Sequence, residues 1–278
     1  MNPQKTIFDD VSLKCSKITT KSYSTSFSLA IKLLNKEYRQ AIYSIYGFVR
    51  LADEIVDSFH GYNKKQLLSE LRHNTIDALE KKISLNPIIN SFQQTVKEYN
   101  IEWRLIDSFL ESMEYDLENT TCNEKTYKKY IAGSAEAVGL MCLQVFSKQG
   151  SIHYNELEEY AKSLGSAFQK INFLRDLKDD YTNLNRIYFP NLDIHNLNKE
   201  EKKIIEKDIK KDFDHALIGI KLLNKEAKKG VYLAYKYYMS LFKKIQQTSP
   251  EEMLNRRIRI SNIRKIFILI YSQIRFLI

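Results

Sequence analysis

The sequence is poor in the residues that interrupt helices. Its 278 residues include only 8 glycines and 4 prolines, below the average usage of about 7% and 5%. It shows no β-rich block, no Gly/Ser-rich linker and no internal repeat of solenoid length. Leucine, isoleucine, lysine and glutamate are plentiful instead. This composition predicts an all-α fold, and we expect residues 1–278 to form a single domain.

Cysteine and histidine are also scarce. The three cysteines, Cys15, Cys122 and Cys142, lie far apart and form no CxxC motif, which argues against a disulfide framework and against a zinc site. The 5 histidines are scattered, and none pairs with another at metal-ligand spacing. We therefore expect a protein of a reducing, cytoplasmic compartment.

Long hydrophobic runs are missing. The N-terminal MNPQKTIFDD has no apolar stretch, so it does not resemble a signal peptide. The apolar run at residues 266–278, IFILIYSQIRFLI, contains Arg275 and is shorter than the roughly 20 residues that a bilayer-spanning helix needs. Two roles stay open for this run: it is either the last core helix or a contact with a membrane surface.

The net charge of +9 raises the question of a nucleic-acid partner. Lysine pairs at residues 81–82, 202–203 and 228–229 are mixed with glutamate along helical segments, as on an ordinary solvated surface. The sequence contains no nucleic-acid-binding motif, so we expect no nucleic-acid partner. A polyanionic substrate or an acidic membrane surface would also suit this charge balance.

Hydrophobic periodicity predicts most of the helices. It extends over residues 36–59, 64–84, 102–117, 126–147, 154–184, 199–229 and 231–247, with a further helix from Pro87 and a last helical pair after residues 248–252. Residues 60–63 separate the first two helices. The stretch 186–198, which contains Pro190, is expected to be a loop.

Two of these helices carry regular rows of polar residues. The row in YGFVRLADEIVD (46–57) is Tyr46, Arg50, Asp53 and Asp57, and the row in QKINFLRDLKDD (169–180) is Gln169, Asn172, Asp176 and Asp180. Spacings of three and four residues place each row on one face of its helix. The other residues of both helices are mainly apolar, so the rows border the core, where polar groups need partners.

A divalent cation is a natural partner for these carboxylates. Asp53 and Asp57 are one turn apart, about 6 Å along the helix axis, and the aspartates of the second row have the same spacing. Like charges this close raise each other's pKa unless a cation lies between them. Mg²⁺ prefers oxygen ligands and often joins carboxylates to phosphates, and Mn²⁺ is an alternative. The simpler interpretation is a solvated acidic face with surface ion pairs, such as one between Arg175 and Asp179.

Further motifs accompany the two rows. They are YSTSF (23–27), YKKYIAGSAEAVG (127–139), RIYFP (186–190) and the basic RRIRISNIRK (256–265). Together with the rows, they resemble the squalene/phytoene synthase family of head-to-head prenyl transferases. RIYFP matches that family's Arg-x-Tyr-x-Pro segment, and the stretch SAEAVGLMCL looks closest to bacterial phytoene synthases.

The resemblance implies an isoprenoid-synthase-type bundle of helices with a central cavity for two allylic prenyl diphosphates. Loss of one diphosphate, assisted by Mg²⁺, would give a cation that the other substrate captures as a cyclopropylcarbinyl diphosphate. A second ionisation and rearrangement would give the linear product. We expect two geranylgeranyl diphosphates to give phytoene. The alternatives are a squalene- or diapophytoene-type synthase that uses farnesyl diphosphate, and a catalytically silent helical protein that binds prenyl lipids.

The resemblance also implies roles for individual residues. Metal ligands would be Asp53, Asp57, Asn172, Asp176 and Asp180. Contacts with the substrate would come from Ser24, Ser26, Tyr46, Arg50, Gln169, Asn172, Arg175, Tyr188, Arg257 and Lys265. Catalysis would involve the four aspartates and Tyr127.

The sequence departs from the family's pattern at three positions. The first motif reads DExxD, with Glu54 one residue off the face of the aspartates. Asn185 stands where many relatives have glycine, and Glu136 stands where many have a small or apolar residue.

Long hydrocarbon substrates and products imply exchange with a bilayer. We therefore expect a cytoplasmic protein that associates peripherally with the inner face of the membrane, attracted in part by its positive charge. The oligomeric state stays open.

Overall fold

The computed structural model describes residues 3–147, 154–190, 192 and 197–275. These residues form an all-α fold, as predicted, and within them the only β-type pairing is one isolated bridge between Thr121 and Ile187. The first eight elements are α1 (Pro3–Tyr23), α2 (Thr25–Lys32), α3 (Lys36–Asp57), α4 (Lys64–Lys81), α5 (Pro87–Tyr99), α6 (Trp103–Glu118), α7 (Glu124–Ile131) and the π-helix η1 (Ala132–Glu136). They are followed by α8 (Ala137–Ser147), α9 (Tyr154–Leu184), α10 (Lys199–Leu222), α11 (Lys225–Gln247), α12 (Pro250–Asn255) and α13 (Asn262–Arg275).

Side-chain caps determine where several helices begin. Asn123 and Asn198 form capping boxes at the N-termini of α7 and α10, which satisfies backbone N–H groups that have no partner inside the helix. The helices α5 and α12 each begin with a proline, preceded by the caps Asn86 and Ser249. Proline suits this first position because its missing N–H is not needed there.

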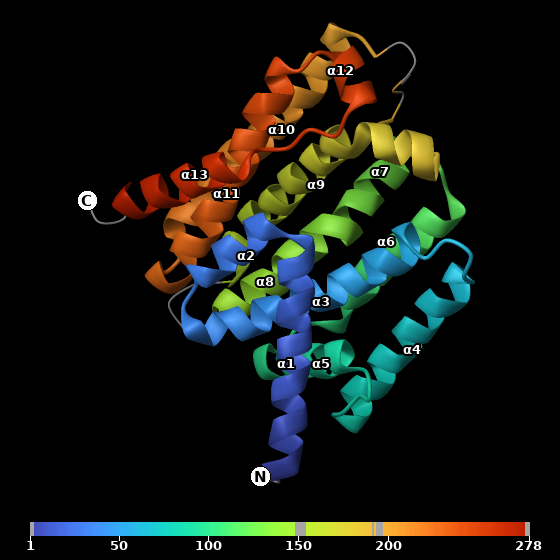
Figure 1. Cartoon of the computed structure of the whole chain (residues 1–278), viewed down its shortest axis with the longest axis vertical. Helices are drawn as coiled ribbons and strands as arrows, with labels where there is room; N and C mark the ends of the chain where they lie inside the picture. The colour runs from blue at the N-terminus through green and yellow to red at the C-terminus, as the bar shows by residue number, and fades with distance from the viewer. Residues whose placement is uncertain (1–2, 148–153, 191, 193–196, 276–278) are drawn as a thin grey trace.

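Helices α3, α8 and α9 form the centre of the molecule (Figure 1). One buried cluster joins α3 to α4, α5, α6 and α8, and it includes the stacked rings of Phe48 and Phe92, whose centroids are 4.0 Å apart. A second cluster joins α9 to α10, α11 and α12. The N-terminal part of α9 reaches the first cluster through Leu157, but the part that carries its polar row belongs to the second. The candidate site lies between α3 and this part of α9.

The π-helical turn η1 interrupts the helix formed by α7 and α8. Such turns insert one extra residue and are frequent at functional sites. Glycines let the neighbouring helices approach it: a Cβ at Gly133 would lie 2.4 Å from the carbonyl oxygen of Ser108 in α6. A Cβ at Gly165 in α9 would lie 2.6 Å from the carbonyl oxygen of Ala135. The turn is thus held tightly between α6 and α9.

The helical stretch Glu124–Ser147 could cross a membrane by length and composition alone, and among the described residues it is the one stretch that meets these criteria. However, 56% of its most apolar 18-residue window is buried inside the molecule, and the stretch contacts α3, α6 and α9. Buried core helices meet the same criteria, so the central position of this stretch accounts for its hydrophobicity.

The structure differs from the predicted helices at the N-terminus and at the end of α10. Helices α1 and α2 have no counterpart in the predicted set, which begins at residue 36. The helix predicted over residues 199–229 is wrong at its end: α10 stops at Leu222, and α11 begins at Lys225. The cause is Asn224, whose side chain accepts a hydrogen bond from the backbone N–H of Ala227 and so begins a new helix.

The C-terminal run does not form a core helix. Helix α13 packs against the molecule through Ile268 and Leu269, but Phe267 is 68% exposed. Residues 276–278 of this run lie outside the described residues, and so do residues 191 and 193–196 of the loop predicted at 186–198.

Candidate active site

A cavity of 650 Å³ lies between α2, α3, α8, α9, α10 and α11. Most of its wall is apolar, but acidic residues line it at the C-terminal parts of α3 and α9 and at the end of α6. The four aspartates of the two predicted rows, Asp53, Asp57, Asp176 and Asp180, all belong to this lining. The fold therefore brings both rows to one cavity.

The first row lies on α3, where Arg50 contacts an aromatic ring and two carboxylates. Its guanidinium lies 4.2 Å from the centroid of the Tyr23 ring and pairs with the carboxylate of Glu54. One of its terminal nitrogens is 3.8 Å from Asp53 Oδ2. Arg50 Nε is buried and has no hydrogen-bond partner. Because an unpaired buried donor is costly, this atom on the cavity wall is suited to an anionic ligand.

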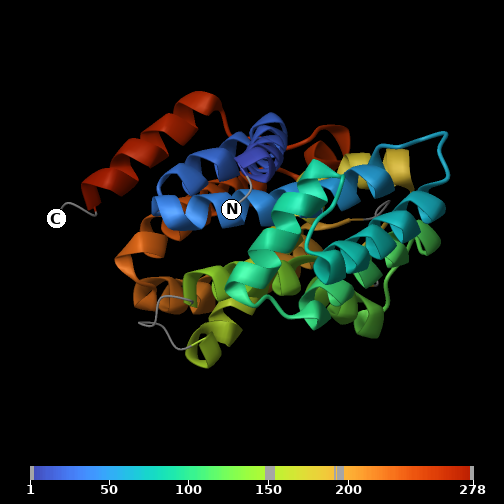
Figure 2. The same ribbon diagram turned by 90° about the horizontal axis from the view of Figure 1, so that it is seen from below.

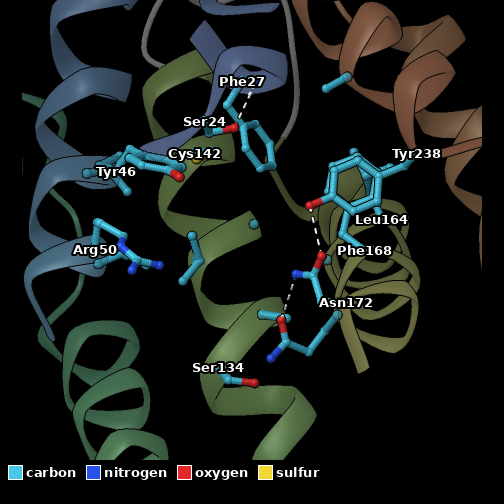
Figure 3. A pocket seen from close by; sticks show the side chains of 18 of the residues that line it. Ser24, Phe27, Tyr46, Arg50, Ser134, Cys142, Leu164, Phe168, Asn172 and Tyr238 are labelled. Carbon is cyan, nitrogen blue, oxygen red and sulfur yellow. Dashed lines mark hydrogen bonds between the residues drawn. The ribbon is translucent and has the colours of Figure 1, made fainter. Parts of the chain in front are cut away.

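The second row lies on α9 and forms a chain of hydrogen bonds. Tyr238 Oη donates to Asn172 Oδ1 at 3.2 Å, and Asn172 Nδ2 donates to Gln169 Oε1 at 3.4 Å (Figure 3). Further along the helix, Arg175 Nε donates to Asp176 Oδ1 at 3.0 Å. Arg175 therefore pairs with a carboxylate of the row, beside the cavity, instead of forming the surface pair that the simpler interpretation requires.

The basic C-terminal segment lies against α9 at the same place. Arg257 Nε is 2.6 Å from Asp176 Oδ1, and the backbone N–H of Ile258 donates to the carbonyl oxygen of Arg175 at 3.4 Å. Ile258 is buried in the second core cluster. The segment is thus anchored by an apolar side chain, and this anchoring adds a third arginine to the acidic end of the cavity.

A network of hydrogen bonds connects α3, α6 and α7 with the loop after α9 at this end of the cavity. The sequence analysis did not predict this network. Asp116 of α6 accepts hydrogen bonds from Tyr130 Oη at 2.6 Å and from Tyr188 Oη at 3.3 Å. Arg186, on the loop after α9, donates to Asp57 Oδ1 at 2.7 Å and lies 3.9 Å from Asp116 Oδ2. Its guanidinium therefore bridges a carboxylate of the first row and the buried Asp116.

The backbone at Asn185 positions this loop. Its φ angle is +53°, in the left-handed region that glycine occupies without cost and that asparagine tolerates better than most residues. This explains how asparagine can stand where relatives have glycine. The next residue then turns back, and the backbone N–H of Arg186 donates to the carbonyl oxygen of Asp180 at 2.9 Å.

The crowding of carboxylates changes their protonation. Burial, and after it the neighbouring Asp57 carboxylate, raises the pKa of Asp53 to about 7. Burial likewise raises the pKa of Asp180 to about 8, with contributions from Asp176 and from Asp57 on the facing row. The pKa of Asp116 rises to about 7, mainly by burial. The two rows are therefore close enough to repel one another.

The donor set at this end suits a hard divalent cation. It consists of carboxylate oxygens and the amide oxygen of Asn172, and their mutual repulsion is the condition that a cation relieves. Within the described residues, no three side chains of histidine, cysteine, aspartate or glutamate lie close enough together to hold a metal ion by themselves. A metal bound here would therefore need further oxygen ligands, from water or from a phosphate.

Aromatic side chains line the middle of the cavity. The rings of Phe168 and Tyr238 stack with centroids 3.8 Å apart, and the ring of Phe27 lies 6.1 Å and 5.8 Å from them. Tyr46 extends this group on the α3 side, 5.7 Å from Phe27. Figure 3 shows these side chains converging from α2, α3, α9 and α11. Ser24 lies beside them as the N-cap of α2, accepting a hydrogen bond from the backbone N–H of Phe27 at 3.2 Å.

Most of the residues expected in the site line this cavity, but three do not. The lining includes Ser24, Tyr46, Arg50, Gln169, Asn172, Arg175, Tyr188 and Arg257. Ser26 is absent from it. Tyr127 is absent as well: it packs 5.9 Å from the ring of Phe189 in the second core cluster. Lys265 donates to Thr25 Oγ1 at 2.5 Å, outside the lining.

The sequence-based set lacked six residues of the site described above. They are Phe27, Asp116, Tyr130, Phe168, Arg186 and Tyr238. The sequence held a signal for Asp116, because it continues the apolar stripe of Ile106, Phe109 and Met113 on α6, where a carboxylate is out of place. Arg186 belongs to the RIYFP motif, but its inward direction depends on the turn at Asn185.

The sequence profile of the squalene/phytoene synthase family matches residues 20–264 of this chain. The chain belongs to the squalene/phytoene synthase family. The 4,4'-diapophytoene synthase of Staphylococcus haemolyticus is 25% identical to it over 250 residues, which cover 82% of this chain and 85% of that protein. The phytoene synthase of Mycobacterium tuberculosis is 24% identical over 177 residues, which cover 62% of this chain and 55% of that protein.

Solved structures show that the fold is shared with known proteins. A dehydrosqualene synthase in complex with a ligand has a TM-score of 0.81 and 20% identity, covering 96% of this chain and 97% of that one. The squalene synthase HpnC from Alicyclobacillus acidocaldarius has a TM-score of 0.75 and 18% identity, covering 87% and 95%. The isoprenoid-synthase-type helical fold expected from the motifs is confirmed. Members of this family are prenyl transferases that act on prenyl diphosphates.

Proposed function

We propose that this squalene/phytoene synthase family member joins two allylic prenyl diphosphates head to head. The observation that supports this best is how polar and apolar side chains are distributed along the cavity. Two rows of carboxylates and three arginines gather at its acidic end, while aromatic and aliphatic side chains line the rest. A diphosphate head needs the first environment, and a prenyl chain needs the second.

The arginines would orient the diphosphate groups. Arg50, Arg175 and Arg257 each present a planar fork of N–H donors, which suits phosphate oxygens better than a lysine ammonium does. In the structure their partners are carboxylates of the same site. A diphosphate entering the cavity would take over some of these donors, and Arg50 Nε, which is buried and unpaired, is the atom best prepared for it.

The metal assignment is part of the proposal. Asp53, Asp57, Asn172, Asp176 and Asp180 would hold Mg²⁺, or Mn²⁺ in its place, and the bound ion would neutralise the charge that develops on the departing diphosphate. The chain's own contribution is to keep these oxygen donors facing one another in a partly buried setting. The Tyr238–Asn172–Gln169 chain of hydrogen bonds fixes the amide of Asn172 for this purpose.

The apolar wall would protect the carbocation that ionisation leaves. Faces of aromatic rings attract cations by about 0.5–2 kcal/mol each, and Phe27, Phe168 and Tyr238 present such rings next to the diphosphate end. Water would quench the cation, so a cavity lined mainly by apolar groups favours coupling over hydrolysis.

Two substrate lengths are candidates. The sequence motifs favour two geranylgeranyl diphosphates, giving phytoene through a cyclopropylcarbinyl diphosphate. The longer match to a 4,4'-diapophytoene synthase favours farnesyl diphosphate as the second candidate.

A direct assay separates these candidates. Purified protein is incubated with Mg²⁺ and either geranylgeranyl or farnesyl diphosphate, and the hydrocarbon is identified by its mass. Formation of a head-to-head product from either substrate supports the proposal, and its mass gives the chain length. If the protein releases no diphosphate from any allylic substrate with Mg²⁺ or Mn²⁺, the proposal fails, and a catalytically silent prenyl-lipid-binding protein becomes the better description.

A further inference from the structure

Helix α13 exposes an apolar face that nothing in the described structure covers. Its solvent-facing large apolar side chains, each more than half exposed, are Ile263, Ile266, Phe267, Ile270 and Tyr271. Spacings of three and four residues place all of them on one side of the helix. Contiguous exposed apolar surface of this kind marks a contact with a partner or a membrane.

The opposite side of α13 faces the wall of the cavity. Ile268 and Leu269 pack against a small buried cluster that includes Ala30 of α2 and Ala234 of α11. Both of these alanines line the cavity. Helix α13 therefore lies directly over a cavity wall, with its free apolar side turned away from the molecule.

Helix α1 presents a second exposed stripe, which combines apolar and basic residues. Ile7, Val11, Lys14, Ile18 and Lys21 follow one another at spacings of three and four, so they share one helix face. All five are exposed to solvent. An apolar stripe interleaved with lysines is the pattern of a helix that lies in the surface of an anionic membrane.

A basic groove adjoins this stripe. It lies between α1 and the segment from the end of α2 to the start of α3, and it is lined by Lys14, Lys17, Lys21, Lys32, Lys36 and Arg39, with Asp10 as its single carboxylate. Such an excess of cations gives the groove a strongly positive potential. Its complement is a surface rich in phosphate or carboxylate groups.

The two helices lie on the same side of the molecule. In Figure 1 both α1 and α13 face the viewer with α2 between them, and in Figure 2 both lie along the upper side. Helix α2 lines the cavity through Phe27, Ala30 and Ile31, and its N-cap Ser24 lines it too. We define the face formed by α1, α2 and α13 as the basic apolar face.

We propose that the basic apolar face docks on an anionic lipid bilayer, with phospholipid headgroups in the groove and the exposed side of α13 inserted among the acyl chains. This docking surface goes beyond the proposed reaction and does not depend on it. It would place a bilayer against the α2 wall of the cavity.

Charge and composition favour this occupant over two others. The groove is lined by six cations and one carboxylate, so two copies of this face would bring like charges together, which is unfavourable. A nucleic acid would satisfy the groove but would leave the apolar side of α13 exposed to water. An anionic bilayer satisfies both features, since basic residues near its surface contribute about 1 kcal/mol each and apolar side chains can enter its interface.

Vesicle flotation without any prenyl substrate tests the docking independently of catalysis. Wild-type protein should float with vesicles containing phosphatidylglycerol at low salt, float less at high salt, and stay unbound with pure phosphatidylcholine. The triple variant Lys14→Gln, Lys17→Gln, Lys21→Gln should lose binding by about tenfold or more. A control that removes the same charge from α10, Lys203→Gln, Lys207→Gln, Lys211→Gln, should change it by less than about twofold.

Insertion of α13 has its own readout. The chain has a single tryptophan, Trp103, so a Trp103→Phe, Phe267→Trp variant reports from the exposed side of α13 alone. Lipids brominated on their acyl chains should quench its fluorescence in anionic vesicles. Circular dichroism confirms that each variant keeps its helices.

Several outcomes would overturn the proposal. They are absence of wild-type flotation on anionic vesicles at low salt, equal losses in the groove and α10 variants, and an unquenched Trp at position 267. A fourth is a dimer in sedimentation analysis that Phe267→Ser dissociates, which would show the apolar side of α13 to be a protein–protein interface instead.

Discussion

Arg257 Nε lies 2.6 Å from Asp176 Oδ1, although the two residues are 81 positions apart in the chain. The contact fastens the C-terminal basic segment to the second carboxylate row. Arg175, the neighbour of Asp176, donates to the same carboxylate at 3.0 Å. Arg175 and Arg257 therefore both bind the carboxylate of Asp176.

We expect Asp176→Ala and Asp53→Ala each to reduce turnover by about 10²-fold or more. Each variant removes one oxygen ligand from the place where the metal and the diphosphate would meet. Steady-state assays measure the effect, with circular dichroism to check that the helices persist. Asp214→Ala is the matched control, because Asp214 pairs with Lys210 on the exposed surface of α10. Near-normal activity of either site variant would remove the metal assignment.

Arg175→Lys should slow turnover by about tenfold or more, which corresponds to about 1.4 kcal/mol, without changing the product. Lysine keeps the positive charge but loses the planar fork that can hold two phosphate oxygens at once. Arg104→Lys serves as a control, since Arg104 pairs only with the nearby Glu102 on the surface among the ion pairs of the described residues. A wild-type rate for Arg175→Lys would mean that other basic residues hold the diphosphate.

A stability measurement can test metal binding without turnover. Mg²⁺ with inorganic pyrophosphate should raise the Tm of the protein, because a ligand that binds only the folded state stabilises it. Mg²⁺ alone should raise it less, since no three acidic side chains of the described structure form a complete site. The variant Asp53→Asn, Asp180→Asn should lose the joint effect. An equal rise with pyrophosphate and EDTA would show that the diphosphate binds without metal.

The two carboxylate rows could be predicted from the sequence because each lies on one regular helix. Periodicity alone places Asp53 beside Asp57, and Asp176 beside Asp180. That the rows face each other is a tertiary relationship, and the sequence could suggest it only through the family resemblance. The sequence left two roles open for the C-terminal run for a related reason: an apolar run looks the same whether it is covered or not.

Tyr127 and Tyr130 show the limit of a residue assigned through a family resemblance. Both residues lie on α7, three positions apart, but only Tyr130 lines the cavity. The Tyr127 ring packs 5.9 Å from that of Phe189 in the second core cluster instead, a tertiary contact that the spacing of residues in the sequence does not reveal. Arg186 was missed for a different reason, because its direction is set by the left-handed backbone of Asn185.

Arg186→Met should destabilise the fold as well as the site. Arg186 is 6% exposed and bridges Asp57 and Asp116, so its removal leaves the buried Asp116 without its cation. Breaking such a pair from one side costs about 3 kcal/mol, which urea unfolding would measure. Adding Asp116→Asn to Arg186→Met should recover part of the loss, because the unpaired charge disappears. Additive losses in the double variant would contradict this account of the network.

The cavity's depth along α9 leads to a prediction about substrate length. Ala161 and Asp176 both line the cavity, and at 1.5 Å per residue they are about 22 Å apart along the helix axis. A prenyl chain whose diphosphate lies at Asp176 would extend toward Ala161. We therefore expect Ala161→Phe to lower kcat/KM about tenfold more for geranylgeranyl than for farnesyl diphosphate, because the added ring shortens the apolar end of the cavity.

Parallel assays with both diphosphates measure this ratio, and Ala161→Ser, which preserves the volume, is the matched control. The serine variant should keep the wild-type preference. Equal losses for both substrates in Ala161→Phe would mean that the ring disturbs the packing of α9 against α8, where a Cβ on Gly139 would already lie 3.0 Å from the carbonyl oxygen of Ala161. Unchanged values for both would place the prenyl chain elsewhere, toward the α10 and α11 walls instead of along α9.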